Sequence, residues 1–161
     1  MKRMFFTVVW SFLSAHIAAA QPVRVYLFTA PAAQFVDQKS KGRADSLKDV
    51  RDRMKGKKTL QLVDSVEEAD LSVEIIERVF QQTGNSTSTF KPYVGVETTA
   101  ESKPSIHVTL TAGTYSTELY GSQITVWGKG GVWRSAAEGL ASDVEKWVKE
   151  NHEQLIAGRN R

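Results

Sequence analysis

A glycine-rich turn near the end of the chain holds the residues best suited to bind a small ligand. The segment 127–134 reads WGKGGVWR and leads directly into the longest amphipathic stretch of the sequence. Glycines let backbone N–H groups approach a ligand closely, and the start of a helix favours an anion. We therefore predict a weak anion-binding site formed by Lys129, Gly130, Gly131 and Arg134. The alternative is a plain connection whose tryptophans dock the helix onto the rest of the fold.

The same turn matches no nucleotide-binding motif. It lacks the GxxxxGK[ST] spacing of a P-loop, and it does not open the strand–helix–strand unit of a dinucleotide-binding fold. Metal sites need three or four converging ligands, whereas the chain has no cysteine and, beyond its first 20 residues, only His107 and His152. We expect no cofactor and no metal site, and we interpret His107 as an exposed histidine on a strand.

Side chains for hydrolysis are present, but their spacing fixes no active site. Gly121-Ser122 lacks the second glycine of the GxSxG turn that exposes a nucleophilic serine. Pairs of carboxylates could act as they do in glycosidases. The glutamates available on or near predicted strands are Glu74, Glu77, Glu97, Glu101 and Glu118. We predict no catalytic residue, and a small secreted hydrolase with strand-borne carboxylates remains an alternative.

The elements that must position these residues alternate between strand and helix in the first half of the chain. Alternating apolar side chains over 23–30 predict a strand that ends at Pro31. A polar loop is expected over 37–43, and Ser46 then resembles a helix N-cap with Asp49 in the capping-box position. The other elements predicted here are a helix over 46–55, a strand over 59–63 and one helical turn over 65–68.

The second half is predicted to be mostly strand, followed by one long helix. A strand over 71–81 alternates until the Ile75-Ile76 pair, where we expect a β-bulge. Polar and proline-containing segments predict a turn over 83–89 and a long loop over 90–104 with an extended piece at 93–97. Further strands are expected over 105–110, 115–120 and 123–127, with a break at Gly121, then an amphipathic helix over 133–155 and a frayed tail after Ala157.

An apolar stripe on the last helix indicates the fold class. Trp133, Leu140, Val144 and Trp147 share one face of that helix, and charged residues occupy the other. Both tryptophans are predicted to pack in the core. Helices packed on one sheet are an economical way to bury such faces. We predict a single α+β domain over 21–161, with a mixed, mostly antiparallel sheet packed against a long C-terminal amphipathic helix and one shorter helix.

The first 20 residues have the features of a secretory signal peptide. Lys2 and Arg3 precede an apolar run over 4–20 that closes on three alanines, the small-x-small pattern that signal peptidase accepts. The run is interrupted by polar residues and is shorter than the roughly 20 apolar residues of a spanning helix. We predict cleavage after Ala20 and release into the periplasm or the medium.

The charge and cysteine content of the mature chain limit the kinds of partner and membrane attachment that we expect. The full chain has 21 Lys and Arg against 18 Asp and Glu, and Lys2 and Arg3 leave with the signal peptide. The remaining net charge of about +1 gives no argument for binding nucleic acid. Without cysteine the chain has no residue for a lipid anchor, and no second apolar run is long enough to span a membrane.

The Ala-Asp step between two predicted strands carries a resemblance to known envelope proteins. The segment 59–74, TLQLVDSVEEADLSVE, is predicted as strand, capped turn, Ala-Asp and strand. This order resembles the small α/β domain at the amino terminus of TolB translocation proteins and in CsgG-like envelope assembly lipoproteins. The resemblance covers most of 23–151 and implies a similar fold and an envelope setting. It implies no active site, and this chain lacks the lipid-anchor cysteine of the CsgG group.

These features predict an exported, non-catalytic domain that binds or helps assemble another envelope protein. A shallow surface with an open sheet edge would favour this function. A clustered, partly buried pair of acids in a pocket would favour the hydrolase instead. A third alternative, a soluble ligand carrier, requires an internal apolar cavity.

Overall fold

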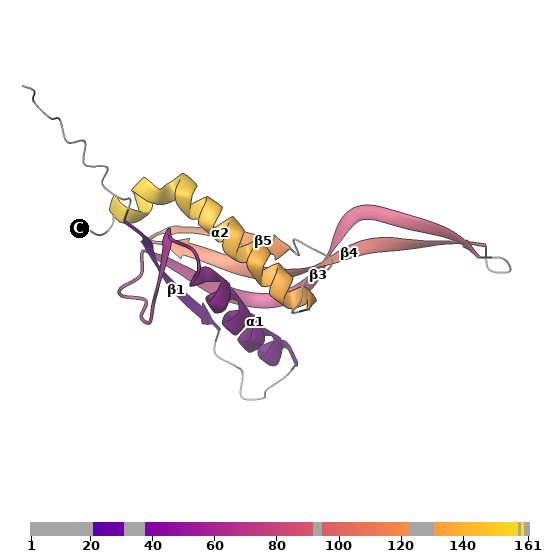
Figure 1. Cartoon of the computed structure of the whole chain (residues 1–161), viewed down its shortest axis with the longest axis horizontal. Coiled ribbons are helices and arrows are strands. Elements are labelled where there is room, and N and C mark those ends of the chain that lie inside the picture. The colour runs from indigo at the N-terminus through magenta and orange to yellow at the C-terminus, as the bar shows by residue number, and fades with distance from the viewer. Residues whose placement is uncertain (1–20, 31–37, 92–94, 123–130, 158, 160–161) are drawn as a thin grey trace, which may run out of the picture.

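A five-stranded mixed sheet with two helices forms the fold (Figure 1). The elements are β1 (Val23–Thr29), α1 (Gln38–Met54), β2 (Leu60–Val63), β3 (Leu71–Lys91), β4 (Gly95–Ala112), β5 (Tyr115–Ser122) and α2 (Val132–Ala157). In the order β2-β1-β3-β4-β5, β1 is parallel to β2 and β3, and the other two pairs are antiparallel. The computed structural model describes residues 21–30, 38–91, 95–122, 131–157 and 159. The predicted signal peptide and the predicted strand over 123–127 lie outside the described residues.

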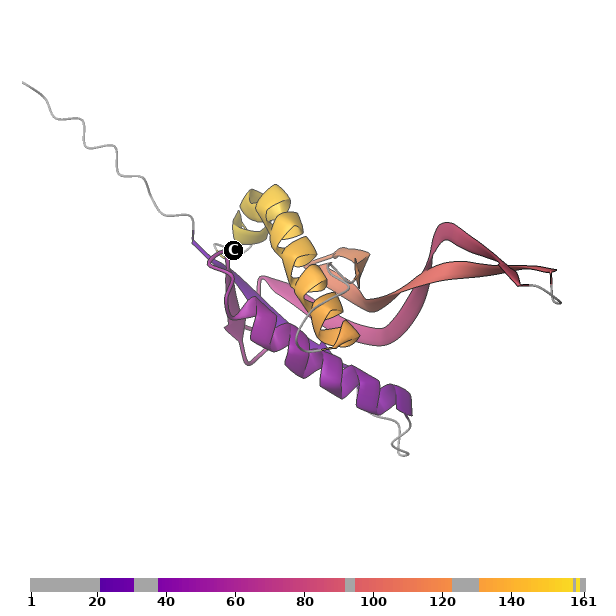
Figure 2. The same cartoon turned by 45° about the vertical axis from the view of Figure 1, so that its right-hand side comes forward.

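Both helices cover the same face of the sheet (Figure 1 and Figure 2). α1 lies against β1 and β3, and α2 lies against β4 and β5. Every second strand residue points into the core beneath them, and full burial of each such side chain stabilises the fold by about 1.5–3 kcal/mol. The buried strand residues include Val23, Val25, Leu27, Leu71, Val73, Ile75, Ile106, Val108 and Leu110. The fold class predicted from the sequence is confirmed.

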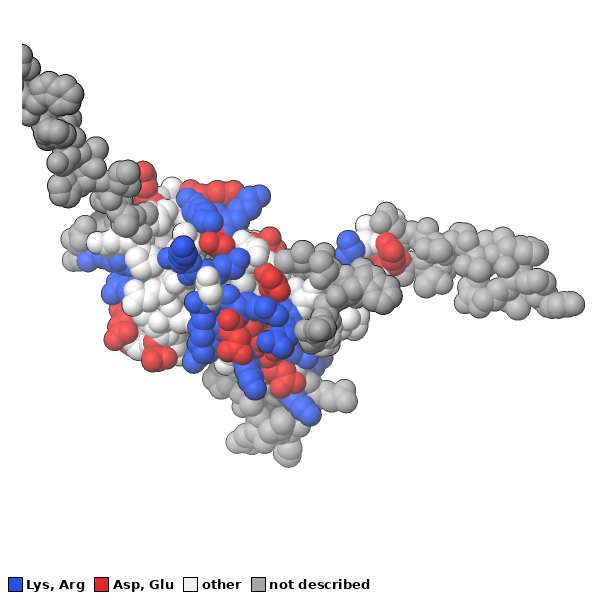
Figure 3. Space-filling view, viewed as in Figure 1, with Lys and Arg blue, Asp and Glu red and all other residues white. Residues whose placement is uncertain are grey.

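The first helix begins eight residues earlier than predicted. α1 starts at Gln38, so residues 38–43, which were predicted to form a polar loop, are helical. Ser46, predicted as the N-cap, is fully buried in the helix interior, where its hydroxyl accepts a hydrogen bond from Arg78. Acidic and basic side chains are interspersed on this side of the molecule, as expected for solvated helix surfaces (Figure 3).

β3 and β4 continue far beyond their neighbours and form a two-stranded arm (Figure 1 and Figure 2). β1 pairs with β3 no further than Ile75, and β5 pairs with β4 only from Ser105. Among the described residues, 81–91 and 95–103 pair with each other alone, and we call these two segments the arm. The turn predicted over 83–89 was therefore wrong, as was the loop predicted over 90–104 in its described part, except over 95–97, where an extended piece was expected. Buried strands are recognised by apolar alternation, which this threonine- and serine-rich stretch lacks.

Two details of the sheet bear on the predicted breaks. The register of β3 against β4 shifts between Ile75 and Glu77, which confirms the predicted bulge. β5 runs through Gly121 without the predicted interruption, and Gly121 pairs with Ile106. The β4–β5 turn is opened by Gly113 at φ 58°, a left-handed conformation that glycine adopts at low cost.

Candidate functional site

Arg78 and Trp133 fix the base of the arm to the second helix. The Arg78 guanidinium carbon lies 4.9 Å from the centre of the Trp133 ring, a cation–π contact. The same indole packs edge-on against Phe80, with ring centroids 5.3 Å apart. Trp133 belongs to the first turn of α2, whereas Arg78 and Phe80 lie in β3 just before the arm. These contacts therefore join the root of the arm to the helix layer.

The first helix supplies the other contacts of Arg78. Its Nε donates a hydrogen bond of 2.7 Å to Ser46 Oγ, and its guanidinium lies 3.6 Å from the carboxylate of Asp49. Burial lowers the pKa of Arg78, while Asp45 and Asp49 act in the opposite direction. Arg78 is thus a partly buried cation with balancing charges, and it holds three elements together.

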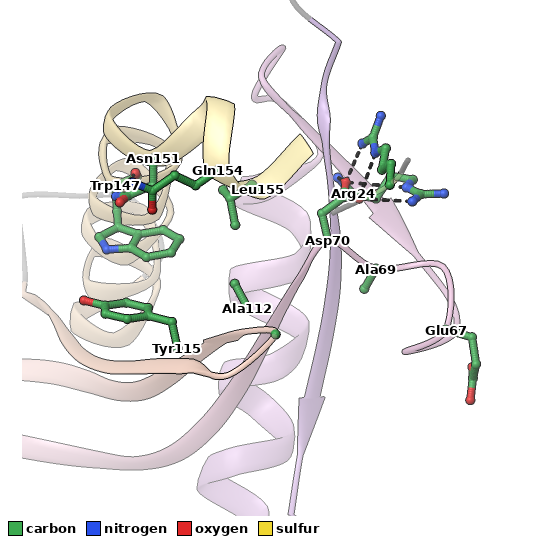
Figure 4. Close-up of a pocket in the computed structure, with 12 residues that line it drawn as sticks. Arg24, Glu67, Ala69, Asp70, Ala112, Tyr115, Trp147, Asn151, Gln154 and Leu155 are labelled. Carbon is green, nitrogen blue, oxygen red and sulfur yellow. Dashed lines mark hydrogen bonds and ion pairs between the residues drawn. The ribbon is translucent and has the colours of Figure 1, made fainter. Parts of the chain in front are cut away.

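A cavity of about 570 Å³ (Figure 4) lies beside the C-terminal end of α2, at the end of the sheet away from the arm (Figure 1). It is lined by the last turns of α2, the β4–β5 turn, the segment 67–70 before β3, and Arg24 of β1. One side is aromatic, because the rings of Tyr115 and Trp147 stack 6.1 Å apart and within 17° of parallel. Leu155 and Ala112 add apolar surface, and charged residues form the other side. Its size falls in the usual range for small-ligand sites.

Asp70 organises the charged side of this cavity. Its side chain is 2% exposed and accepts hydrogen bonds from Arg24 N at 2.7 Å and Arg24 Nη2 at 3.0 Å. Arg159 adds a second guanidinium through its Nε at 2.8 Å and its Nη2. The same Arg159 donates to Gln21 Oε1 and to the carbonyl of Pro22. Asp70 therefore ties the beginning of β1 to a residue beyond the end of α2.

This arrangement keeps the Asp70 carboxylate ionised. Burial alone would raise the pKa of Asp70, but hydrogen bonds from Arg159 and Arg24 outweigh burial and hold the pKa at about 2. A general base needs a pKa near the working pH and a free lone pair toward the substrate. Asp70 meets neither requirement, so its role is to hold the two arginines in place.

The predicted anion site falls partly within the described residues. Gly131 precedes α2 with φ 82°, a left-handed conformation, and Arg134 is exposed in the first helical turn. Lys129 and Gly130 lie outside the described residues. The structure thus places two of the four residues at the start of α2, and anion binding there stays a prediction.

Among the described side chains, none of the predicted carboxylates lines the cavity. Glu74 and Glu118 flank Thr109 in register on the face of the sheet opposite the helices. His107 on the same face is 13% exposed, so its interpretation as an exposed histidine was wrong. Its ring stacks on Tyr120 at 4.2 Å, and its Nε2 lies 3.3 Å from the Glu118 carboxylate.

Two further findings concern metals and membranes. No group of three or more His, Asp or Glu side chains that could hold a metal ion occurs among the described residues. Within the same residues, no helix is both long and apolar enough to cross a membrane.

Sequence reasoning missed the roles of Asp70, Arg78 and Arg159. Asp70 was visible as part of the Ala-Asp step, but its two arginine partners are 46 and 89 residues away. Arg159 was expected to fray with the tail, and it is instead bound to Asp70. No local pattern marks such contacts, because they arise where β1, the segment before β3 and Arg159 meet.

No family model matches this chain, and none of the curated proteins matches it. Among solved structures, it is similar to the hypothetical protein CT253 of Chlamydia trachomatis, with 12% identity and a TM-score of 0.34. That match covers 86% of this chain and 99% of the other.

Proposed function

We propose that this chain is an exported, non-catalytic domain that binds or helps assemble another component of the bacterial envelope. The observation that carries the proposal is the arm, a ribbon whose strands pair with nothing else among the described residues. The predicted signal peptide supports an extracytoplasmic location, periplasmic or secreted, after cleavage behind Ala20.

The arm adds little to the stability of the domain that carries it. No core residue of the described part of the chain lies between Ile75 and Ile106. A two-stranded hairpin alone is marginally stable in water, and its open edges offer backbone groups for pairing with another extended chain. A long ribbon that buries no described side chain in the core is therefore best explained by contact with a partner.

The sequence at the end of the arm supports this role. Residues 90–96 read FKPYVGV, and five of them have apolar or aromatic side chains larger than alanine. Phe90 and Val96 are direct partners in the register of β3 and β4. Large apolar residues at the end of a projecting ribbon suit burial against a partner protein.

Shortening the arm tests this function without removing the core. Gln81 and Lys103 are paired, so a two-residue Asn-Gly turn can join them in place of 82–102. We expect the mature protein to capture a specific envelope protein from membrane and periplasmic extract, and the shortened variant to lose it. A second variant, Phe90→Ser with Val96→Ser, keeps the length of the arm and should weaken the same capture.

The control is the fold of the shortened variant. Its thermal unfolding should stay cooperative, because the buried residues of the sheet and helices are unchanged. Recovery of the same proteins by the full-length and shortened forms would reject a binding role for the arm. Turnover of a substrate panel by the purified protein would favour the hydrolase instead.

A further inference from the structure

We propose that the cavity beside Asp70 is a binding site for an uncharged saccharide, held by the aromatic rings of Tyr115 and Trp147 and by the amides of Asn151 and Gln154 (Figure 4). This inference goes beyond the proposed assembly function and does not rest on the arm, which lies at the other end of the sheet.

The balance of charge around the cavity argues against an ionic ligand. Two guanidiniums, Arg24 and Arg159, and two carboxylates, Glu67 and Asp70, line it. Asp70 accepts hydrogen bonds from both arginines, and Arg159 is also bound to the backbone of Pro22. Both guanidiniums are thus already bound to Asp70, and Glu67 is exposed to solvent, so a charged ligand would lose hydration with little return.

The aromatic side of the cavity provides an open ring face. Tyr115 stacks one face of its ring on Trp147 and is still 56% exposed, so its other face is open to a ligand. Trp147 is partly buried and packs against the edge of the core, as predicted. The rest of its ring lines the cavity. Pyranose rings present faces made of C–H groups, and such faces pack on aromatic rings.

The two amides supply the hydrogen bonds that a saccharide needs. Asn151 donates from Nδ2 to the Trp147 carbonyl at 2.8 Å, which fixes its side chain beside the indole. Gln154 follows one helical turn later and is exposed. An amide both donates and accepts, and sugar hydroxyls do the same, so the two groups complement each other without charge.

The Trp147 indole N–H resonance, assigned with Trp147→Phe, gives a direct measure of binding. We would titrate the mature protein with chitotriose, cellotriose and maltotriose, and with benzoate and spermidine as charged probes. At least one saccharide should shift this resonance in a saturable way. Tyr115→Ala and Gln154→Ala should each raise the Kd about fivefold or more, the usual effect of removing one packing or hydrogen-bonding group.

Matched controls lie on the same elements. Tyr120→Ala changes the same strand on its opposite face, and Glu153→Ala is adjacent to Gln154, so both should leave the Kd unchanged. An unshifted resonance with all three saccharides would overturn the proposal, as would equal weakening by Tyr115→Ala and Tyr120→Ala. A stronger response to benzoate or spermidine would also reject it. The shortened-arm variant should bind the saccharide normally, which separates this site from the arm.

Discussion

Gly121 of β5 lies directly beneath Leu140 of α2. A Cβ atom at Gly121 would stand 2.1 Å from Leu140 Cβ, 2.4 Å from its Cα and 2.6 Å from its backbone nitrogen. These atoms belong to the helix itself and cannot turn aside as the end of a flexible side chain can. The absence of a side chain at residue 121 therefore sets how closely the long helix approaches the sheet.

Gly121→Ala should accordingly destabilise the protein strongly. The added methyl group forces α2 away from β5, and overpacking of this kind costs about 1–3 kcal/mol or more. Urea unfolding followed by circular dichroism measures the loss. Gly56→Ala is the matched control, since its nearest atom would be 3.7 Å away. Equal stability of the two variants would contradict the close approach.

The sequence predicted those elements whose apolar residues face the core. Alternation identified β1 and the bulge at Ile75, and the helical stripe identified α2, because burial selects side chains at the period of each element. Gly121 was wrongly interpreted as a strand break, because the local sequence does not reveal the contact with Leu140. A glycine required by close contact with another element looks the same in sequence as a glycine required by a turn.

The rest of the fold depends on contacts that no short window of sequence contains. The first part of α1 carries few apolar residues, and Ser46 within it is held by Arg78, 32 residues away. The described side chains of the arm, at 81–84 and 101–103, are not buried in the core, and the sequence of the arm shows no apolar alternation. The cavity was missed because Tyr115 and Trp147 meet only when the β4–β5 turn folds under α2.

Replacing the buried carboxylate of Asp70 should show how much its contacts with Arg24 and Arg159 contribute to the stability of the fold. Asp70→Asn leaves the guanidiniums of Arg24 and Arg159 without their counter-ion. We expect a loss of about 2–4 kcal/mol in the free energy of unfolding, less than for a fully buried pair because both arginines reach solvent. Asp64→Asn, at an exposed position, is the control. Similar losses in both variants would show that the contacts of Asp70 do not stabilise the fold.

The same carboxylate predicts an acid-dependent loss of stability. The pKa of Asp70 is about 2 in the folded protein against an ordinary value of 3.8. A lowered folded pKa means that the stabilisation is present above the ordinary value and is lost as the pH falls toward the folded one. The free energy of unfolding of the wild type should fall by about 2 kcal/mol relative to Asp70→Asn between about pH 5 and pH 2. If the difference in free energy of unfolding between wild type and Asp70→Asn stays constant from about pH 5 to pH 2, the pKa of Asp70 is not lowered.

Conservative replacement at the root of the arm should also be costly. Arg78→Lys keeps the charge but loses the planar group that lies over Trp133 and donates from Nε to Ser46. We expect a loss of about 1–2 kcal/mol and a change in near-ultraviolet circular dichroism from the indole. Arg51→Lys on α1 serves as the comparison and should change neither quantity. An unaltered spectrum in Arg78→Lys would argue against the cation–π contact.

Phosphate binding at the start of α2 can be tested by fluorescence. Gly131 adopts a left-handed conformation directly before the helix, and Arg134 is exposed in its first turn, so backbone N–H groups and a cation lie close together. We expect inorganic phosphate to change tryptophan emission weakly but saturably, since Trp133 belongs to the same helical turn. Lys129→Ala should weaken the response, whereas Lys149→Ala near the other end of the helix should not. Emission that is unchanged in the wild type would leave the glycine-rich turn as a plain connection whose tryptophan docks the helix.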